Sequence, residues 1–192
     1  MKRGIQIGII GLMLSAFLVV PICAQPGTTI TGTALIYGSG FNTRTTTRPF
    51  TMTLNGKTSP EEAARYLSAL QQGGQDSLMR AIDSNNLGRF ALSGSVGQPL
   101  QAVIVDEDGG DTRIRAVFRR WVGFGELRRG ARSVDFPFGY VEVRVDPRTG
   151  RGDGMIIPAA RIRFRNNNVE IEDFGTFPGR LMGVRVRGVP RP

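Results

Sequence analysis

The chain has 192 residues, with 25 Lys and Arg against 16 Asp and Glu, no His and a single Cys. These absences exclude Ser-His and Cys-His catalytic pairs, disulfides within the chain, and zinc or copper sites built from Cys and His. The basic surplus suits an anionic partner, but a GC-rich genome also produces an Arg-rich, Lys-poor chain, and we favour that explanation. Arg residues are scattered among Asp and Glu rather than clustered with aromatic residues, which argues against nucleic acid as a partner.

The N-terminus has the pattern of a secretory signal peptide. A basic segment at residues 1–3 precedes an apolar run over residues 5–20 and a cleavable end at Ala24. The run is shorter than the roughly 20 apolar residues of a membrane-spanning helix. We therefore expect residues 1–24 to be a signal peptide, and residues 25–192 to form one β-rich domain that is exported to the periplasm or the extracellular space.

Short β-branched or alternating segments predict strands over most of the exported part. Turn sequences rich in Gly, Asn and Asp separate them, as in antiparallel sheets. The segments are 28–37, 48–54, 89–93, 100–105, 112–121, 141–145, 155–157, 161–164, 169–172 and 181–186. We expect a mainly β fold, either an antiparallel β-barrel or a compact sandwich.

A helical pair is expected as an insertion at about residues 59–84. Ser59 can cap free N–H groups, Pro60 suits the first helical position, and the acidic residues that follow favour the positive end of the helix dipole. Gly73 and Gly74 end the first helix, and Asp76 caps the second.

The segment from Val141 to Pro158 predicts one strand, a turn and a second strand. Val at 141, 143 and 145 alternates with charged residues, which indicates one buried and one solvated face. The Gly-rich segment 148–154 predicts a solvated hairpin turn. Pro158 cannot donate a hydrogen bond to a central ladder, so it indicates an edge position or a bulge.

Asn166 and Asn167 predict a two-residue hairpin turn, since Asn tolerates the left-handed conformation that a type I′ turn requires. This turn places Ile162 opposite Ile171 and Arg163 opposite Glu170, with apolar and charged pairs on opposite faces. We expect the charged face to carry cross-strand ion pairs rather than an anion-binding ladder.

The acidic segment 106–111 connects two predicted strands. Its four carboxylates are hard oxygen ligands of the kind that calcium binds. The spacing lacks the alternating acids and distal Glu of an EF-hand loop, so we interpret the segment as an acidic hairpin tip and expect no metal site.

Residues 121–140 hold the only Trp and the densest aromatic residues, in a loop too long for a simple turn. Such a loop is where binding residues gather, although its aromatic residues would equally plug one end of a barrel. A pocket there would use an apolar wall with Arg residues for an anionic group. The candidate ligand-binding residues are Trp121, Phe124, Arg128, Arg132, Phe136 and Tyr140, with Arg119 and Arg120 close by in sequence.

Several segments of the second half of the exported part are similar to a group of uncharacterised secreted proteins of soil bacteria. They are Phe124-Gly125-Glu126, residues 130–135, Pro137-Phe138-Gly139, residues 158–162 and residues 181–184. The resemblance implies a shared fold and an exported destination. It brings no activity, ligand or catalytic residue with it.

The sequence favours a non-enzymatic function without a cofactor: a monomeric exported domain that binds a small apolar or anionic ligand, or a component of the cell envelope. The alternative is a hydrolase acting on an envelope polysaccharide, with Glu126 and Asp135 as weak candidates for acid and base. A third class is an interaction protein that binds through a flat Arg-rich sheet face. Its binding should weaken steeply as salt is raised.

Overall fold

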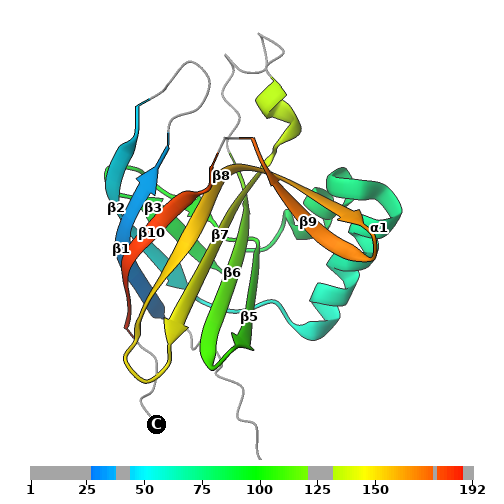
Figure 1. Ribbon diagram of the computed structural model, residues 1–192. Coiled ribbons are helices and arrows are strands. Elements are labelled where there is room, and N and C mark those ends of the chain that lie inside the picture. The colour runs from blue at the N-terminus through cyan, green and yellow to red at the C-terminus, as the bar shows by residue number, and fades with distance from the viewer. Residues whose placement is uncertain (1–26, 38–43, 121–131, 175–176, 188–192) are drawn as a thin grey trace, which may run out of the picture.

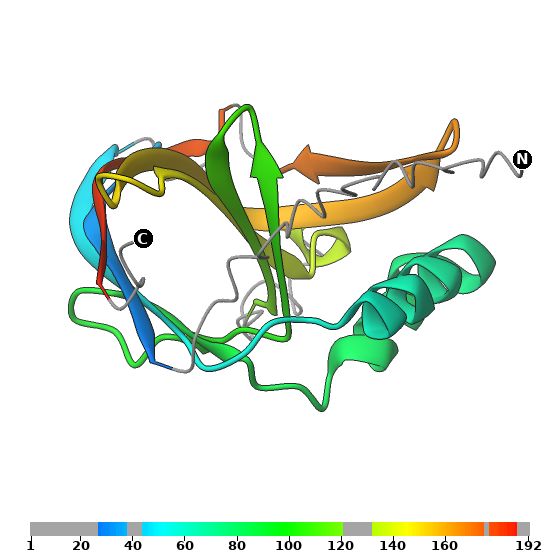
Figure 2. The ribbon, with the colours of Figure 1, turned by 90° about the horizontal axis from the view of Figure 1, so that it is seen from below.

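The computed structural model describes residues 27–37, 44–120, 132–174 and 177–187. They form one antiparallel sheet curled into a half-barrel, with a helix beside its outer face (Figures 1 and 2). The predicted mainly β fold is confirmed. Of the two predicted architectures, the single curled sheet agrees with a barrel, here half closed, and not with a sandwich of two packed sheets. The predicted signal peptide, residues 1–24, lies outside the described residues.

The predicted strands and helical region are found in their expected order along the chain, together with β4 and η1, which were not predicted. They are β1 (Thr28–Ile36), β2 (Thr46–Leu54), α1 (Pro60–Ile82), β3 (Gly88–Leu92), β4 (Gln98–Pro99), β5 (Ala102–Asp108), β6 (Asp111–Arg119), the 3₁₀ helix η1 (Arg132–Asp135), β7 (Phe138–Asp146), β8 (Arg151–Arg165), β9 (Asn168–Asp173) and β10 (Gly179–Arg187).

The strands lie in the order β4-β3-β2-β1-β10-β8-β7-β6-β5, and β9 pairs with the far half of β8. The residues between β4 and β5 bridge the two ends of this sheet. Leu100 N donates to Gly88 O of β3, and Gln101 N donates to Val117 O of β6, at 2.9 and 3.0 Å. These bonds curl the sheet around its interior.

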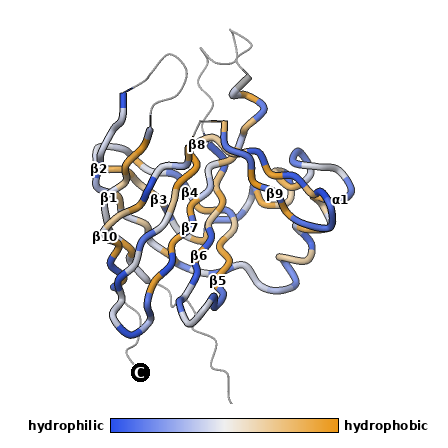
Figure 3. Tube along the Cα trace, in the orientation of Figure 1, coloured by the Kyte–Doolittle hydropathy of each residue, from blue (hydrophilic) through white to orange (hydrophobic). Residues whose placement is uncertain are grey.

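The inward faces of the strands form the main core. Val141, Val143 and Val145 are all buried there, as their alternation predicts. Phe90 stacks between Phe50 and Phe118, with ring centroids 5.6 and 6.0 Å away. Hydrophobic residues follow the strands, and hydrophilic residues gather at the turn between β7 and β8 (Figure 3).

A second core lies outside the half-barrel, where α1 packs against outward-facing residues of β5, β7 and β8. Ser59 caps α1 as predicted: Ser59 Oγ accepts from Glu62 N, and Glu62 Oε2 accepts from Ser59 N. The buried side of α1 presents Tyr66, Leu70, Leu78 and Ile82.

The predicted helical pair is α1, whose 23 residues form two helical segments divided by a kink. Gly73 and Gly74 have non-helical dihedral angles, with φ of −134° and 65°, but the chain resumes its helical course at once. Asp76 lies two residues after this break, near the start of the second helical segment. The predicted break between two helical segments at the glycines is confirmed.

Two details of β7 and β8 differ from the prediction. The turn between them covers only residues 147–150, because Gly152 and Gly154 lie within β8 and pair with Val145 and Val143. A Cβ at Gly152 would stand 1.8 Å from Arg144 O, so Gly is needed there for close strand approach. The predicted strands at 155–157 and 161–164 are one strand, β8, that continues through Pro158.

Pro158 lies at a bulge, as predicted. The register between β7 and β8 shifts between Phe138 and Tyr140, opposite Pro158, and β8 has its last pair with β10 at Ile156. Beyond this point β8 leaves the half-barrel and forms a hairpin with β9 that projects beside α1 (Figure 2). The bulge therefore sets the position of the hairpin.

The β8–β9 hairpin has the predicted register. Arg163 pairs with Glu170 and Ile162 with Ile171. Asn166 and Asn167 have φ of 49° and 61°, the left-handed values of a type I′ turn. The apolar face of the hairpin joins the second core through Ile162, which is buried.

Replacing Asn167 by Val should lower the free energy of unfolding by about 1–2 kcal/mol, because a β-branched residue is strained in the left-handed conformation. Replacing the same residue by Gly should cost nothing measurable, since Gly adopts positive φ freely. Urea denaturation of both variants gives the comparison. Equal losses in the two would contradict the left-handed turn.

Candidate functional site

An apolar groove runs between α1, the outward face of the sheet and the β8–β9 hairpin. Its volume is about 280 Å³, and we call it the α1 groove. Its lining is apolar except for Arg115 and the hydroxyls of Tyr66 and Tyr140. The lining residues are Ala63, Tyr66, Leu67, Leu70, Leu78, Ala102, Ile104, Arg115, Val117, Tyr140, Ile162, Val169 and Ile171.

The floor of the α1 groove is a row of outward-facing side chains from three neighbouring strands. Ala102 of β5 pairs with Val117 of β6, which pairs with Tyr140 of β7. Alternation along each strand turns these residues away from the half-barrel interior. They are apolar because α1 covers this part of the sheet.

The rim of the α1 groove exposes large apolar side chains. Leu67, Ile104 and Val169 are 38%, 38% and 43% exposed, and they come from α1, β5 and β9. Exposed apolar residues that converge from three elements on one hollow mark a binding surface more often than isolated ones do. The groove is therefore open and apolar at its edge as well as at its floor.

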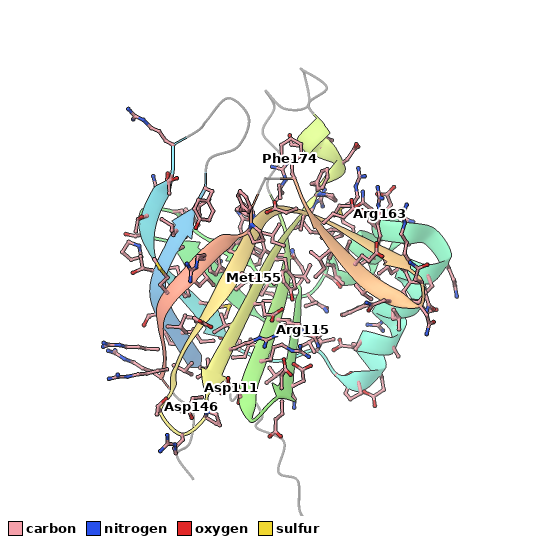
Figure 4. The ribbon with its side chains drawn as sticks, in the orientation of Figure 1. Asp111, Arg115, Asp146, Met155, Arg163 and Phe174 are labelled. Atoms are coloured by element: carbon pink, nitrogen blue, oxygen red, sulfur yellow. The ribbon has the colours of Figure 1, made fainter. Side chains whose placement is uncertain are left out.

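One end of the floor is polar. Tyr140 Oη donates to Glu142 Oε2 at 2.7 Å, and burial raises the pKa of Tyr140. Arg115 Nη2 donates to Asp106 Oδ2 at 2.8 Å, while the buried Arg115 Nε has no hydrogen-bond partner among the described residues. Figure 4 labels Arg115 on the sheet face. The Nε–H group of Arg115 is therefore unpaired among the described residues, but it is buried from solvent.

A second hollow adjoins the α1 groove, and the two share Leu70 and Ile162 as walls. Its volume is about 450 Å³, and we call it the basic cleft. It lies between the middle of α1 and the part of β8 that extends beyond the bulge. It is lined by Leu70, Gln71, Gly74, Gln75, Arg161, Ile162, Arg163, Phe164 and Arg165.

The three arginines of the basic cleft differ in their partners. Arg161 pairs with Asp135 at 3.1 Å, and Arg163 pairs with Glu172 at 3.1 Å. Arg165 is exposed and has no ion pair among the described residues. The cleft therefore keeps cationic groups next to an apolar groove.

The predicted acidic tip is held by ion pairs. Arg113 donates Nε and Nη2 to the two carboxylate oxygens of Asp106 at 3.2 and 2.8 Å. Asp108 pairs with both Arg113 and Arg144, at 3.1 and 3.2 Å. The hydrogen bond from Arg113 is the main cause that holds the pKa of Asp106 below its ordinary value of 3.8. Asp106 and Asp108 therefore form ion pairs with arginines on the outer face of the sheet.

Asp106→Asn should reduce the acid sensitivity of folding. The pKa of Asp106 is lower in the folded than in the unfolded chain, so its stabilisation is present above about pH 4 and is lost as pH falls through the folded-state pKa. Free energies of unfolding in urea at about pH 7 and pH 3 should therefore differ less in this variant than in the wild type. Glu107→Gln removes a carboxylate without an ion pair among the described residues and should keep the wild-type difference. An unchanged difference in Asp106→Asn would contradict the Arg113 pair.

The structure describes only part of the predicted ligand site. Trp121, Phe124, Glu126 and Arg128 lie outside the described residues, as does the side chain of Arg132.

The two predicted site residues that are described, Phe136 and Tyr140, do not share a pocket. Tyr140 lies in the α1 groove, whereas Phe136 packs edge-on against Phe174, with ring centroids 5.3 Å apart. Phe136 reaches the basic cleft through Arg161, whose guanidinium lies 4.6 Å from the ring centroid.

The described charged residues near the predicted loop are engaged by the protein. Asp135, the described member of the predicted acid–base pair, has a side chain that is 65% exposed and ion-paired with Arg161. Arg120 donates Nε to Phe136 O and Nη2 to Ser133 O, both at 2.7 Å, and thereby fastens η1 to the end of β6. Arg119 pairs with Asp83 of the helix end at 3.3 Å. Arg119, Arg120 and Asp135 nevertheless line one hollow of about 750 Å³.

Another apolar cavity of about 280 Å³ lies at one end of the half-barrel. Its walls include Ile36, Phe90, Phe118 and Ile156, and none of its lining residues is charged. Its polar side chains, Ser95 and Gln98, are uncharged, so the cavity has no cationic group to pair with an anion. The α1 groove with the basic cleft has both components.

Sequence patterns missed most of the α1 groove because its residues come from separate segments. One signal was present: Leu67 and Leu70 lie on the predicted helix, and Ile162 and Ile171 pair across the predicted hairpin. Which outward sheet residues these elements would cover depends on the tertiary path of β8. That path follows from the bulge at Pro158.

Among the residues that the structure describes, no helix is long and apolar enough to cross a membrane. The buried side of α1 instead packs on the sheet and hairpin. Comparison of the chain with family models, with curated proteins and with solved structures finds no match.

Proposed function

We propose that the chain is an exported, non-enzymatic binding domain for a small amphipathic acid. The apolar part of the ligand occupies the α1 groove, and its acidic group lies at the basic cleft. The observation that carries this proposal is the union of the two hollows, which share Leu70 and Ile162.

The apolar contribution comes from the floor and rim of the α1 groove. Covering Leu67, Ile104 and Val169, each more than a third exposed, removes apolar surface from water at roughly 25 cal/mol per Å². The volume of about 280 Å³ is at the small end for ligand pockets, which suits a single short chain or ring rather than a bulky lipid.

The charged contribution comes from the basic cleft. Guanidinium groups bind carboxylates and phosphates through two parallel hydrogen bonds, and Arg165 has its guanidinium free of ion pairs among the described residues. Arg163 is ion-paired with Glu172, and this pair remains when no ligand is bound. Arg163 can therefore contact an anion without being an unpaired buried charge in the free protein. Pairing of the acidic group with arginine sets the orientation of the ligand, and the α1 groove provides the apolar surface that the ligand buries.

Titration with 8-anilinonaphthalene-1-sulfonate, an apolar fluorescent anion, tests the proposal. One saturable site per chain is expected, and decanoate should displace the dye at concentrations where acetate does not. Decanol, which has the same apolar chain without the charge, should compete more weakly than decanoate. Failure to saturate, or equal displacement by acetate and decanoate, would contradict an apolar site with a basic end.

A further inference from the structure

A second surface lies on the opposite side of the half-barrel from α1. The neighbouring strands β3, β2, β1 and β10 contain no Asp or Glu (Figure 1). They contain Arg48, Arg89, Arg180, Arg185 and Arg187. The acidic residues of the described strands all lie on β5 to β9. The charge of the chain is therefore strongly divided between the two sides.

The outward residues of these strands form two rows across the sheet. In the first row Arg89 pairs with Thr53, Thr53 with Thr29, and Thr29 with Arg187. The interior residues between them, such as Ile30, Met52 and Val186, alternate with these positions and face the core cluster. A line of two Thr is thus bounded by an Arg on either side.

The second row lies two residues along the strands and has Arg on one side of its two Thr, with Ala91 on the other side. Thr51 pairs with Thr31, Thr31 with Arg185, and Arg185 with Arg151 of β8. Residues two apart on a strand are about 6.6–6.8 Å apart, and adjacent strands are about 4.8 Å apart. The two rows therefore make a compact grid of four Thr with Arg at its borders, which we call the threonine face.

The polar groups of the threonine face have few partners within the protein. Arg151, Arg185 and Arg187 are exposed, and their side chains make no ion pair or hydrogen bond among the described residues. Arg89 gives one bond, from Nη1 to Val96 O at 2.9 Å. Thr51 is exposed and Thr31 is partly exposed. Several guanidinium groups and hydroxyls are thus available to a partner.

We propose that the threonine face binds an anionic polysaccharide that carries carboxylates along its chain. Guanidinium groups pair with the carboxylates, and the Thr hydroxyls exchange hydrogen bonds with the sugar hydroxyls between them. A flexible glycan chain follows the outer curve of the sheet, whereas a rigid nucleic-acid duplex touches such a convex surface along a narrow line only.

Two other polyanions fit the threonine face less well. Binding of single-stranded nucleic acid relies on aromatic side chains on which bases stack, and the two rows contain none. Peripheral attachment to a bilayer uses an apolar face inserted between head groups, and the rows consist of Thr and Arg apart from Ala91 beside Thr51. Charge and hydroxyl density together favour the glycan.

The test uses polygalacturonate as the probe and the full chain as the protein. Arg185→Gln with Arg187→Gln should weaken binding at about 50 mM NaCl fivefold or more, since an exposed Arg–carboxylate contact contributes up to about fivefold in affinity. The matched control, Arg65→Gln with Arg80→Gln, removes the same charge from α1 and should change binding less than about twofold. Thr31→Val with Thr51→Val should also weaken binding and should leave its salt dependence unchanged.

Three results would overturn the proposal: no binding of polygalacturonate at low salt, equal losses in the two Arg double variants, or tighter binding of duplex DNA or of anionic phospholipid vesicles than of the glycan. Dye binding in the α1 groove should be the same in wild type and in the Arg185/Arg187 double variant. That readout separates the threonine face from the small-ligand site, and it also verifies that the variant is folded.

Discussion

Ala63→Trp is expected to weaken the binding of decanoate at least about tenfold, which corresponds to about 1.4 kcal/mol. Ala63 lies in the first turns of α1 and lines the α1 groove. An indole at this position would occupy space that the ligand needs. The free energy of unfolding should change by less than about 1.5 kcal/mol, because the side chain enters open space rather than a packed core.

Ala64→Trp is the matched control for this variant. Ala64 is the next residue of the same helix, but it is exposed and does not line the groove. The same side chain at Ala64 should leave decanoate affinity within about twofold, since it contacts solvent. Dye-displacement titrations of both variants give the comparison. Equal effects of the two variants, or no effect of Ala63→Trp, would remove the α1 groove as the binding site.

Phe90→Ala is expected to lower the free energy of unfolding by about 3–5 kcal/mol. Phe90 is 4% exposed and stacks between Phe50 and Phe118 in the interior of the half-barrel. Its removal leaves a cavity between two rings that the sheet holds apart. Total stabilities of single domains are about 5–15 kcal/mol, so the variant should be close to unfolding in mild denaturant.

Val96→Ala serves as the control for Phe90→Ala, because Val96 is 87% exposed. Its effect should be within about 0.5 kcal/mol of zero. Urea denaturation monitored by circular dichroism measures both. A cost for Phe90→Ala below about 1 kcal/mol would mean that the three rings do not form a packed interior. Where the variant remains folded, decanoate affinity should be preserved, since the α1 groove belongs to the second core.

Local chemistry was enough to predict several elements from the sequence. The Asn166-Asn167 turn fixes the hairpin register by itself, because a one-residue slip would expose Ile162 and bury Arg163. The capping of α1 by Ser59 is equally local, since its partner Glu62 is three residues away. Such features depend on neighbours within one turn, and the sequence contains all of them.

The position of Tyr140 could not be predicted in the same way. It shares the outward face of β7 with Glu142 and Arg144, so alternation assigns it to the solvated side. Tyr140 is nevertheless buried, because α1 covers that end of the strand. Alternation of apolar and polar residues shows which residues of a strand share a face. It does not show which stretch of an outer face another element covers.

The glycines of β8 caused the remaining difference. Gly73 and Gly74 divide α1 into two helical segments as predicted, but Gly152 and Gly154 lie within β8, where glycine-rich sequences more often end an element. In β8 they admit close contact with the β7 backbone. The pairing of β8 with β7 overrides the local preference of these glycines for a loop.

Native mass spectrometry of the chain, incubated with a mixture of decanoate, decanol and acetate, tests the small-ligand site most directly. We expect one decanoate bound per wild-type chain, a smaller fraction of decanol and no acetate. The adduct should be lost in Ala63→Trp and kept in Ala64→Trp. A bare wild-type chain, or the same adduct on both Trp variants, would contradict binding of an amphipathic acid in the α1 groove.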